Sequence, residues 1–249
     1  MSIALLFIVP FLGTVLGSAA VAVLRGEIGE KTGKAITGFA GGVMIAASVW
    51  SLLLPAIEDS SYYTAAFGFL CGIVFLLILD TIVPHIHVTA EKAEGKASGL
   101  SKSMLLMLAV TLHNIPEGMA VGAAAAASGE SIGYSSALAL SIGIALQNFP
   151  EGLIVALPLY KAGKSRGRAF LEGTVSGIVE PVGAIAAFAF VSMLSSLLPF
   201  LLAFAAGAMF YVVVEELIPE ASEGDHSNVG TVGAALGFAL MMLLDGTFG

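Results

Sequence analysis

Two six-residue segments each place an amide, a carboxylate and a proline in the apolar part of this sequence. They are His113-Asn114-Ile115-Pro116-Glu117-Gly118 and Gln147-Asn148-Phe149-Pro150-Glu151-Gly152. An ionisable side chain near the centre of a bilayer costs about 2.5–3.5 kcal/mol on insertion scales, so a carboxylate in each segment indicates a functional site. The same costly pattern occurs twice, which one chance polar residue does not explain.

The first segment places two metal-ligand side chains on one face of a helix. His113 and Glu117 are four residues apart, which separates them by about 40° around a helix and by one turn along it. An imidazole and a carboxylate at this spacing can hold one divalent cation, and Asn114 adds an amide oxygen. Pro116 cannot donate a backbone hydrogen bond, which predicts a bent helix. Gly118 lets another backbone approach.

The second segment repeats this geometry with Gln147 and Glu151 on one face and Asn148 beside them. Pro150 predicts a second bend. Prolines at both positions also predict helices that are interrupted at mid-membrane, as in the ion sites of secondary transporters. Two such helices facing each other would bring the six side chains into one polar site.

Two residues outside the repeated segments could add to this site. Glu180 is a third acid in apolar sequence and precedes Pro181, while Met44 lies in a glycine-containing run where a thioether could reach inward. Mixed imidazole, carboxylate and amide ligands suit zinc, iron(II), manganese and cadmium, and they do not suit a dedicated copper(I) site. The alternative for Met44 is ordinary helix packing.

The composition is that of an integral membrane protein. Of 249 residues, 57% are hydrophobic and 11% are charged, whereas soluble domains contain about 25% charged residues. Apolar stretches of about 20 residues predict membrane-spanning helices, and backbone groups in lipid must pair internally. We therefore expect an all-α polytopic protein of one transmembrane domain, residues 1–249, with a flexible cytoplasmic loop at 84–102. The eight predicted spans are 3–24, 35–56, 62–83, 103–127, 132–159, 169–193, 197–218 and 229–247.

The basic residues predict the orientation. All ten lysines and arginines fall around the first, third and fifth loops, at Arg25, Lys31, Lys34, Lys92, Lys96, Lys102, Lys161, Lys164, Arg166 and Arg168. Loops rich in Lys and Arg face the cytoplasm. Both termini are therefore expected on the extracytoplasmic side.

The Asn-x-Pro-Glu-Gly motifs in the fourth and fifth of eight spans resemble those of the ZIP (Zrt-/Irt-like protein) metal transporters, particularly their bacterial GufA-like branch. The resemblance covers essentially the whole chain. It implies uptake of divalent metal ions toward the cytoplasm, with zinc first and iron, manganese or cadmium as alternatives. It also implies a homodimer in the plasma membrane of a prokaryote, the inner membrane in a Gram-negative cell. The metal would be the transported substrate and no cofactor is implied.

The same resemblance implies a two-metal centre between the fourth and fifth spans. By motif position its ligands would be His113, Asn114, Glu117, Gln147, Asn148, Glu151 and Glu180, with Met44 near one ion. Many family members have histidine where this chain has Gln147, and some have aspartate where it has Asn148. Both departures lower the charge or basicity of the site and therefore bear on its metal preference.

Further polar residues lie near the ends of the predicted spans. His85 and His87 follow Pro84 at the cytoplasmic end of the third span and predict a metal exit site, with Glu215 and Glu216 as candidate partners. Glu58 and Asp245 would lie at the outer ends and could attract cations to an entrance. The acids Glu220, Glu223 and Asp225 with His226 could sample cytoplasmic metal. The alternative for each group is a solvated helix end or loop.

Two other classes of function remain open from the sequence. An intramembrane metalloenzyme could use His and Glu at depth, but the chain has no His-Glu-x-x-His or Gly-x-Ser-x-Gly motif. A cation channel would differ from a carrier in its ohmic currents. No phosphate-binding Gly-x-x-x-x-Gly-Lys-Ser/Thr loop is present. A secondary transporter that is not an enzyme and does not bind nucleic acid is therefore the leading hypothesis.

Overall fold

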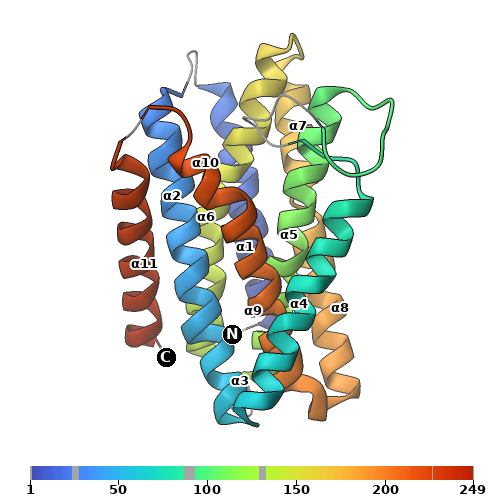
Figure 1. Cartoon of the computed structure of the whole chain (residues 1–249), viewed down its shortest axis with the longest axis vertical. Coiled ribbons are helices and arrows are strands. Elements are labelled where there is room, and N and C mark those ends of the chain that lie inside the picture. Colours follow the sequence, from blue (N-terminus) through green and yellow to red (C-terminus); the bar gives the residue numbers. More distant parts are fainter. Residues whose placement is uncertain (1, 24–27, 87–92, 129–132, 226, 249) are drawn as a thin grey trace.

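The computed structural model describes residues 2–23, 28–86, 93–128, 133–225 and 227–248, except for the side chain of Ser103. Within these ranges the chain is helical and contains no β-strand, and the one isolated β-bridge joins His85 to Glu94. In the described part of the chain, eight helical segments are long and apolar enough to cross a membrane. They stand roughly parallel in a bundle (Figure 1). The predicted all-α, eight-span architecture is confirmed.

The first four spans are built from seven helical elements. They are α1 (Ile3–Ala19) with the 3-10 turn η1 (Ala20–Ala22), then α2 (Glu30–Ala46) continued by η2 (Ala47–Leu53) and α3 (Leu54–Glu58), then α4 (Tyr62–Ile82), and then α5 (Lys102–Ala127).

The last four spans follow in the same alternating direction. They are α6 (Tyr134–Lys161), then α7 (Arg166–Ser176) with α8 (Val179–Met193), then η3 (Ser195–Leu197) and α9 (Leu198–Val212) continued by η4 (Val213–Leu217) and α10 (Ile218–Ser222), and then α11 (Val229–Phe248).

The predicted spans agree with these segments except at several polar ends. The second span begins at Glu30 instead of residue 35, the sixth at Arg166 instead of 169, and the seventh continues to Ser222. Lys34 therefore belongs to α2 and not to a loop. Its ammonium pairs with the Glu30 carboxylate at 2.7 Å and donates to the carbonyl of Asp225 at 3.0 Å, so the buried lysine is satisfied.

The expected interruption of the fourth and fifth spans is wrong. Helix α5 runs unbroken through Pro116, and α6 runs unbroken through Pro150. A bend at either proline stays a prediction. The break lies instead in the sixth span, where α7 ends at Ser176 and α8 begins at Val179. Pro181 is then in the first turn of α8, where a missing N–H removes no helical hydrogen bond.

Two spans contain a widened, π-helical turn just before a proline. The segment η2 precedes α3, whose second residue is Pro55, and η4 precedes α10, whose second residue is Pro219. A proline disturbs the hydrogen bonds of the preceding turn, and single π turns are frequent at functional sites. The turn η4 contains Glu215 and Glu216.

The motif glycines set the packing of the helices that carry the polar segments. Helix α5 packs along α8, and α6 packs along α1. A Cβ atom at Gly118 would overlap the backbone carbonyl of Glu180, and one at Gly152 would overlap that of Thr14. The predicted close backbone approach at Gly118 is therefore confirmed, and Gly152 provides the same approach toward α1.

The two termini lie toward the same end of the bundle, opposite the segment that joins α4 to α5 (Figure 1). The joins between α4 and α5 and between α6 and α7 lie at that opposite end, as an even number of antiparallel spans requires. Among the predicted basic positions, Arg25 and Lys92 lie outside the described residues. Which end faces the cytoplasm stays a prediction.

Candidate metal centre

The seven motif-predicted polar residues are buried and come from three neighbouring helices. His113, Asn114 and Glu117 project from α5, Gln147, Asn148 and Glu151 from α6, and Glu180 from the first turn of α8. Helix α5 contacts both α6 and α8. The structure therefore brings the two repeated segments and Glu180 into one polar region within the bundle.

Four oxygens in this region have no hydrogen-bond partner among the described residues. They are Asn114 Oδ1, Glu117 Oε2, Gln147 Oε1 and Glu151 Oε2, and all four are buried. An unsatisfied buried polar atom costs about 1–3 kcal/mol, and more when it is charged. A cation that accepts these oxygens as ligands would remove that cost. The oxygens thus have the chemistry of a hard or borderline divalent-metal site.

Hydrogen bonds determine which side-chain amide atom of Asn114 and of Gln147 can coordinate a metal. Asn114 Nδ2 donates to the carbonyl of Ser176 at 3.1 Å, and Gln147 Nε2 donates to Glu117 Oε1 at 2.5 Å. Carbonyl and carboxylate oxygens only accept, so the nitrogen of each amide must face these partners. The oxygen of each amide is the atom left for a metal.

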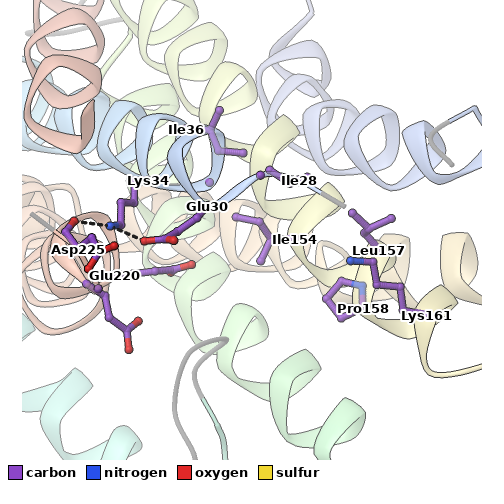
Figure 2. Close-up of a pocket in the computed structure, with 14 residues that line it drawn as sticks. Ile28, Glu30, Lys34, Ile36, Ile154, Leu157, Pro158, Lys161, Glu220 and Asp225 are labelled. Carbon is purple, nitrogen blue, oxygen red and sulfur yellow. Dashed lines mark hydrogen bonds and ion pairs between the residues drawn. The ribbon is translucent and has the colours of Figure 1, made fainter. Parts of the chain in front are cut away.

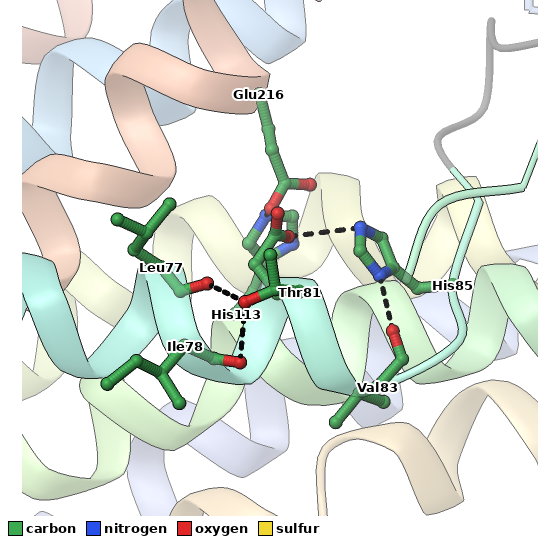
Figure 3. Close-up of polar contacts among 8 residues, drawn as sticks. Leu77, Ile78, Thr81, Val83, His85, His113 and Glu216 are labelled. Carbon is green, nitrogen blue, oxygen red and sulfur yellow. Dashed lines mark hydrogen bonds and ion pairs between the residues drawn. The ribbon is translucent and has the colours of Figure 1, made fainter. Parts of the chain in front are cut away.

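Glu216 contacts the histidine of the first motif. Its Oε1 lies 2.6 Å from His113 Nε2, and both side chains are largely buried (Figure 3). The π turn η4 therefore delivers a carboxylate from the seventh span to the central site. The sequence predicts Glu216 as a partner of the exit histidine His85, and the described contact joins Glu216 to His113. Glu215 is exposed.

Glu180 is held by side chains from two other helices. The Thr14 hydroxyl of α1 donates to its Oε1 at 2.8 Å, and Asn148 Nδ2 of α6 donates to its Oε2 at 2.8 Å. Thr14 was missed in the sequence because a lone threonine in an apolar span gives no ligand signal.

The remaining predicted ligands and entrance residues have different surroundings. Met44 is fully buried within the hydrophobic core that also contains Leu140 and Ile144. Asp245 accepts from the Ser51 hydroxyl, at 3.0 Å to Oδ1 and 2.8 Å to Oδ2. Glu58 is exposed at the end of α3. A ligand role for Met44 and an entrance role for Glu58 and Asp245 stay predictions.

A second group of potential ligands surrounds His85. His85 Nδ1 lies 2.9 Å from the carbonyl of Val83 (Figure 3). His85 Nε2 lies 3.0 Å from Asp80 Oδ1. One ligand atom from each of Asp80, His85 and Glu94 lies within 4.8 Å of the others. A backbone carbonyl on Nδ1 fixes the tautomer that leaves Nε2 for a metal.

The sequence predicted only part of this second group. His87 lies outside the described residues. The exit site predicted from the sequence includes neither Asp80 nor Glu94. An acid about one turn before the end of an apolar helix, followed by His-x-His, is the signal that could have found Asp80. Glu94 reaches His85 only because the chain folds back, with hydrogen bonds of 3.2 and 2.9 Å between the two backbones.

A cavity of about 710 Å³ opens among α2, α6 and the segment after α10 (Figure 2). Its walls include Glu220, Glu223 and Asp225, which are three of the four last-loop residues singled out in the sequence. The fourth, His226, lies outside the described residues. Glu220 lies one turn beyond Glu216 and interacts electrostatically with His113 and Glu151.

Comparisons with known proteins show the family of this chain. The ZIP Zinc transporter family model matches residues 89–245. The zinc transporter ZIPB of Bordetella bronchiseptica is 38% identical over 248 residues, which cover 96% of this chain and 79% of that protein. The zinc transporter GufA of Myxococcus xanthus is 38% identical over 247 residues, which cover 95% and 96%. Human zinc transporter ZIP11 is 34% identical over 84% of this chain and 86% of its own length. The chain with these paired Pro-Glu-Gly helices therefore belongs to the ZIP family, in its bacterial GufA-like branch.

Proposed function

We propose that this protein is a secondary transporter that takes up divalent transition-metal ions, with zinc as its preferred substrate. The observation that carries the proposal is the set of four buried oxygens without hydrogen-bond partners among the described residues, from Asn114, Glu117, Gln147 and Glu151. His113 lies on α5 with Asn114 and Glu117. Relatives that match most of the chain are named zinc transporters, which supports zinc as the ion.

The placement of the acidic residues supports transport toward the cytoplasm. The last-loop acids line the cavity at the end where the predicted cytoplasmic loops lie. Glu220 in its wall is four residues from Glu216, which contacts His113. We propose that a metal ion leaving His113 and Glu151 passes these carboxylates toward the cytoplasm. The protein would act in the plasma membrane of a prokaryote, as a homodimer by family resemblance.

Uptake into proteoliposomes tests the proposed function. We expect Zn²⁺ entry that saturates with concentration, with Cd²⁺, Fe²⁺ and Mn²⁺ as competitors and Ca²⁺ and Mg²⁺ without effect. A hard, oxygen-preferring ion lacks the affinity for imidazole that zinc has, which is the reason for this order. Ohmic single-channel currents would contradict a carrier. If the protein transports no divalent metal, the proposal is wrong and the intramembrane metalloenzyme becomes the leading hypothesis.

We also propose that Asp80, His85 and Glu94 hold the ion on its way out. For His85→Ala we expect kcat for Zn²⁺ uptake to fall about tenfold while KM stays within about twofold, because release and not entry is affected. Initial rates at several Zn²⁺ concentrations separate the two constants. An unchanged kcat in His85→Ala, with the protein still inserted, would argue against an exit role.

A further inference from the structure

One buried face of the second span carries polar side chains along most of its length. Its residues recur at intervals of three and four positions, which is the spacing of a single helix face. Polar side chains inside a membrane are costly, and they commonly line the pathway of an ion. Four of the six residues on this face, which we call the α2 polar face, are polar. All six are buried, and they are Lys34, Thr37, Gly41, Met44, Ser48 and Ser51.

Two hydroxyls on this face have no hydrogen-bond partner among the described residues. They belong to Thr37 and Ser48, whose exposed fractions are 2% and 1%. Other hydroxyls in the spans are satisfied locally. Thr111 and Ser141, for example, each donate to the backbone carbonyl four residues earlier, at 2.7 and 2.9 Å. The hydroxyls of Thr37 and Ser48 are therefore left to bind water or the hydration shell of an ion.

The α2 polar face ends at a charged group on each side. At one end, the Ser51 hydroxyl donates to the Asp245 carboxylate at 2.8 Å, near the end of α11. At the other end, Lys34 lines the cavity of about 710 Å³ together with Glu30 and Asp225 (Figure 2). The face thus connects the predicted entrance acid Asp245 with the cavity at the opposite end of the second span.

Between these ends the α2 polar face lies against the turn that reaches the central site. A Cβ atom at Gly41 would lie 3.5 Å from Leu217 Cβ and 3.7 Å from Val213 Cγ1. These two residues are the ends of η4, which carries Glu216 to its contact with His113. Other glycines of α2 meet the backbone of α11 instead. The polar side of the second span is therefore the side that is turned toward the metal centre.

We propose that the α2 polar face lines the route of the metal ion on both sides of the centre, and that the hydroxyls of Thr37 and Ser48 hold water ligands of the passing ion. The proposal rests on the proposed function and adds to it two residues outside the central site. A hydroxyl can both donate to and accept from water. It carries no charge, so it supports an ion without holding it as a carboxylate would, and weak binding of this kind is what passage requires.

Reaction with a small, water-soluble methanethiosulfonate reagent tests whether the route is open to water. Single cysteines replace Thr37, Ser48 or Ala46 in a Cys71→Ser background, with the full chain in lipid nanodiscs that leave both ends of the bundle accessible. Ala46 is the matched control, because it is fully buried in α2 and lies nine residues from Thr37, about 180° around the helix.

We expect Thr37→Cys and Ser48→Cys to react at least about tenfold faster than Ala46→Cys, since thiol reactivity requires access to water. Bound Zn²⁺ should slow the reaction at Thr37→Cys and Ser48→Cys and leave Ala46→Cys unchanged. A reaction at either position that is no faster than at Ala46→Cys, or that Zn²⁺ does not slow, would overturn the inference. The proposed function fails separately, if the wild-type protein moves no divalent metal into proteoliposomes.

Removing each hydroxyl separates a role in transport from a role in packing. Thr37→Val and Ser48→Ala delete buried polar atoms that have no partner among the described residues. The unfolding temperature in detergent should therefore stay equal or rise, while kcat for Zn²⁺ uptake falls about fivefold, the effect of one lost hydrogen bond. Thr37→Ser keeps the hydroxyl and should retain wild-type uptake. Wild-type kcat in Thr37→Val and Ser48→Ala, or a loss in Thr37→Ser equal to that in Thr37→Val, would contradict the role of the hydroxyls.

Discussion

Replacing Glu117 or Glu151 with alanine is expected to lower the initial rate of Zn²⁺ uptake at least about 100-fold, since even residues behind metal ligands account for 10- to 100-fold effects. Each glutamate supplies one of the four buried oxygens that have no hydrogen-bond partner among the described residues. Glu117 comes from α5 and Glu151 from α6, so either substitution removes one side of the site. The measurement is Zn²⁺ entry into proteoliposomes that contain equal amounts of inserted protein.

Glu172→Ala is the matched control for these two variants. Glu172 is also an acid on a helix of the bundle, but it pairs with Lys164 and lies 3.4 Å from Arg168 near the start of α7. Its pairs are partly exposed and contribute little to stability, so uptake by this variant should remain within about twofold of wild type. Undiminished uptake in both Glu117→Ala and Glu151→Ala would remove the proposed site.

Gly152→Val is expected to destabilise the protein by about 3 kcal/mol and to abolish uptake, because overpacking of a tight core costs about 1–3 kcal/mol and more where backbone must move. A side chain at Gly152 would overlap the Thr14 carbonyl and push α6 away from α1. The neighbouring Glu151 and the Asn148 contact to Glu180 would shift with it. A lower midpoint of thermal unfolding in detergent, together with uptake, measures the effect.

Gly167→Ala provides the contrast on a helix of the same bundle. Nothing lies within 4 Å of a Cβ built at Gly167 in α7. Alanine is the better helix former, and a compatible Gly→Ala change stabilises by about 0.4–1 kcal/mol. We therefore expect an equal or higher unfolding temperature and wild-type uptake. If Gly152→Val were as stable as Gly167→Ala, close packing of α6 on α1 would not be required.

The local sequence was sufficient to predict the membrane spans and the residues that share one helix face in each of the two motifs. Hydropathy over about 20 residues and the need to pair backbone groups within lipid are properties of a segment by itself. Helical spacing likewise places His113 and Glu117 on one side of α5 without reference to other helices. The predicted close approach at Gly118 was confirmed for the same reason, because only glycine leaves space for a neighbouring backbone.

The sequence was less informative about the effect of each proline on its helix. Proline removes a backbone donor, but whether the helix breaks at that residue depends on the packing around it. Helices α5 and α6 are enclosed by their neighbours and continue through Pro116 and Pro150. The sixth span breaks before Pro181 instead, and Asn114 donates to the carbonyl of Ser176 at the end of α7. That compensation comes from a residue 62 positions away.

What the sequence by itself determined, then, is an eight-span helical protein, and its two motif-bearing helices predict a metal site. The tertiary structure decided how the polar atoms are shared. Glu180 accepts hydrogen bonds from Thr14 and Asn148. Glu216 contacts His113, and Asp80 contacts His85. Each of these pairs except the last joins residues from distant parts of the chain. Hydropathy and periodicity describe one segment at a time, whereas the direction of a hydrogen bond depends on which atoms face each other across helices.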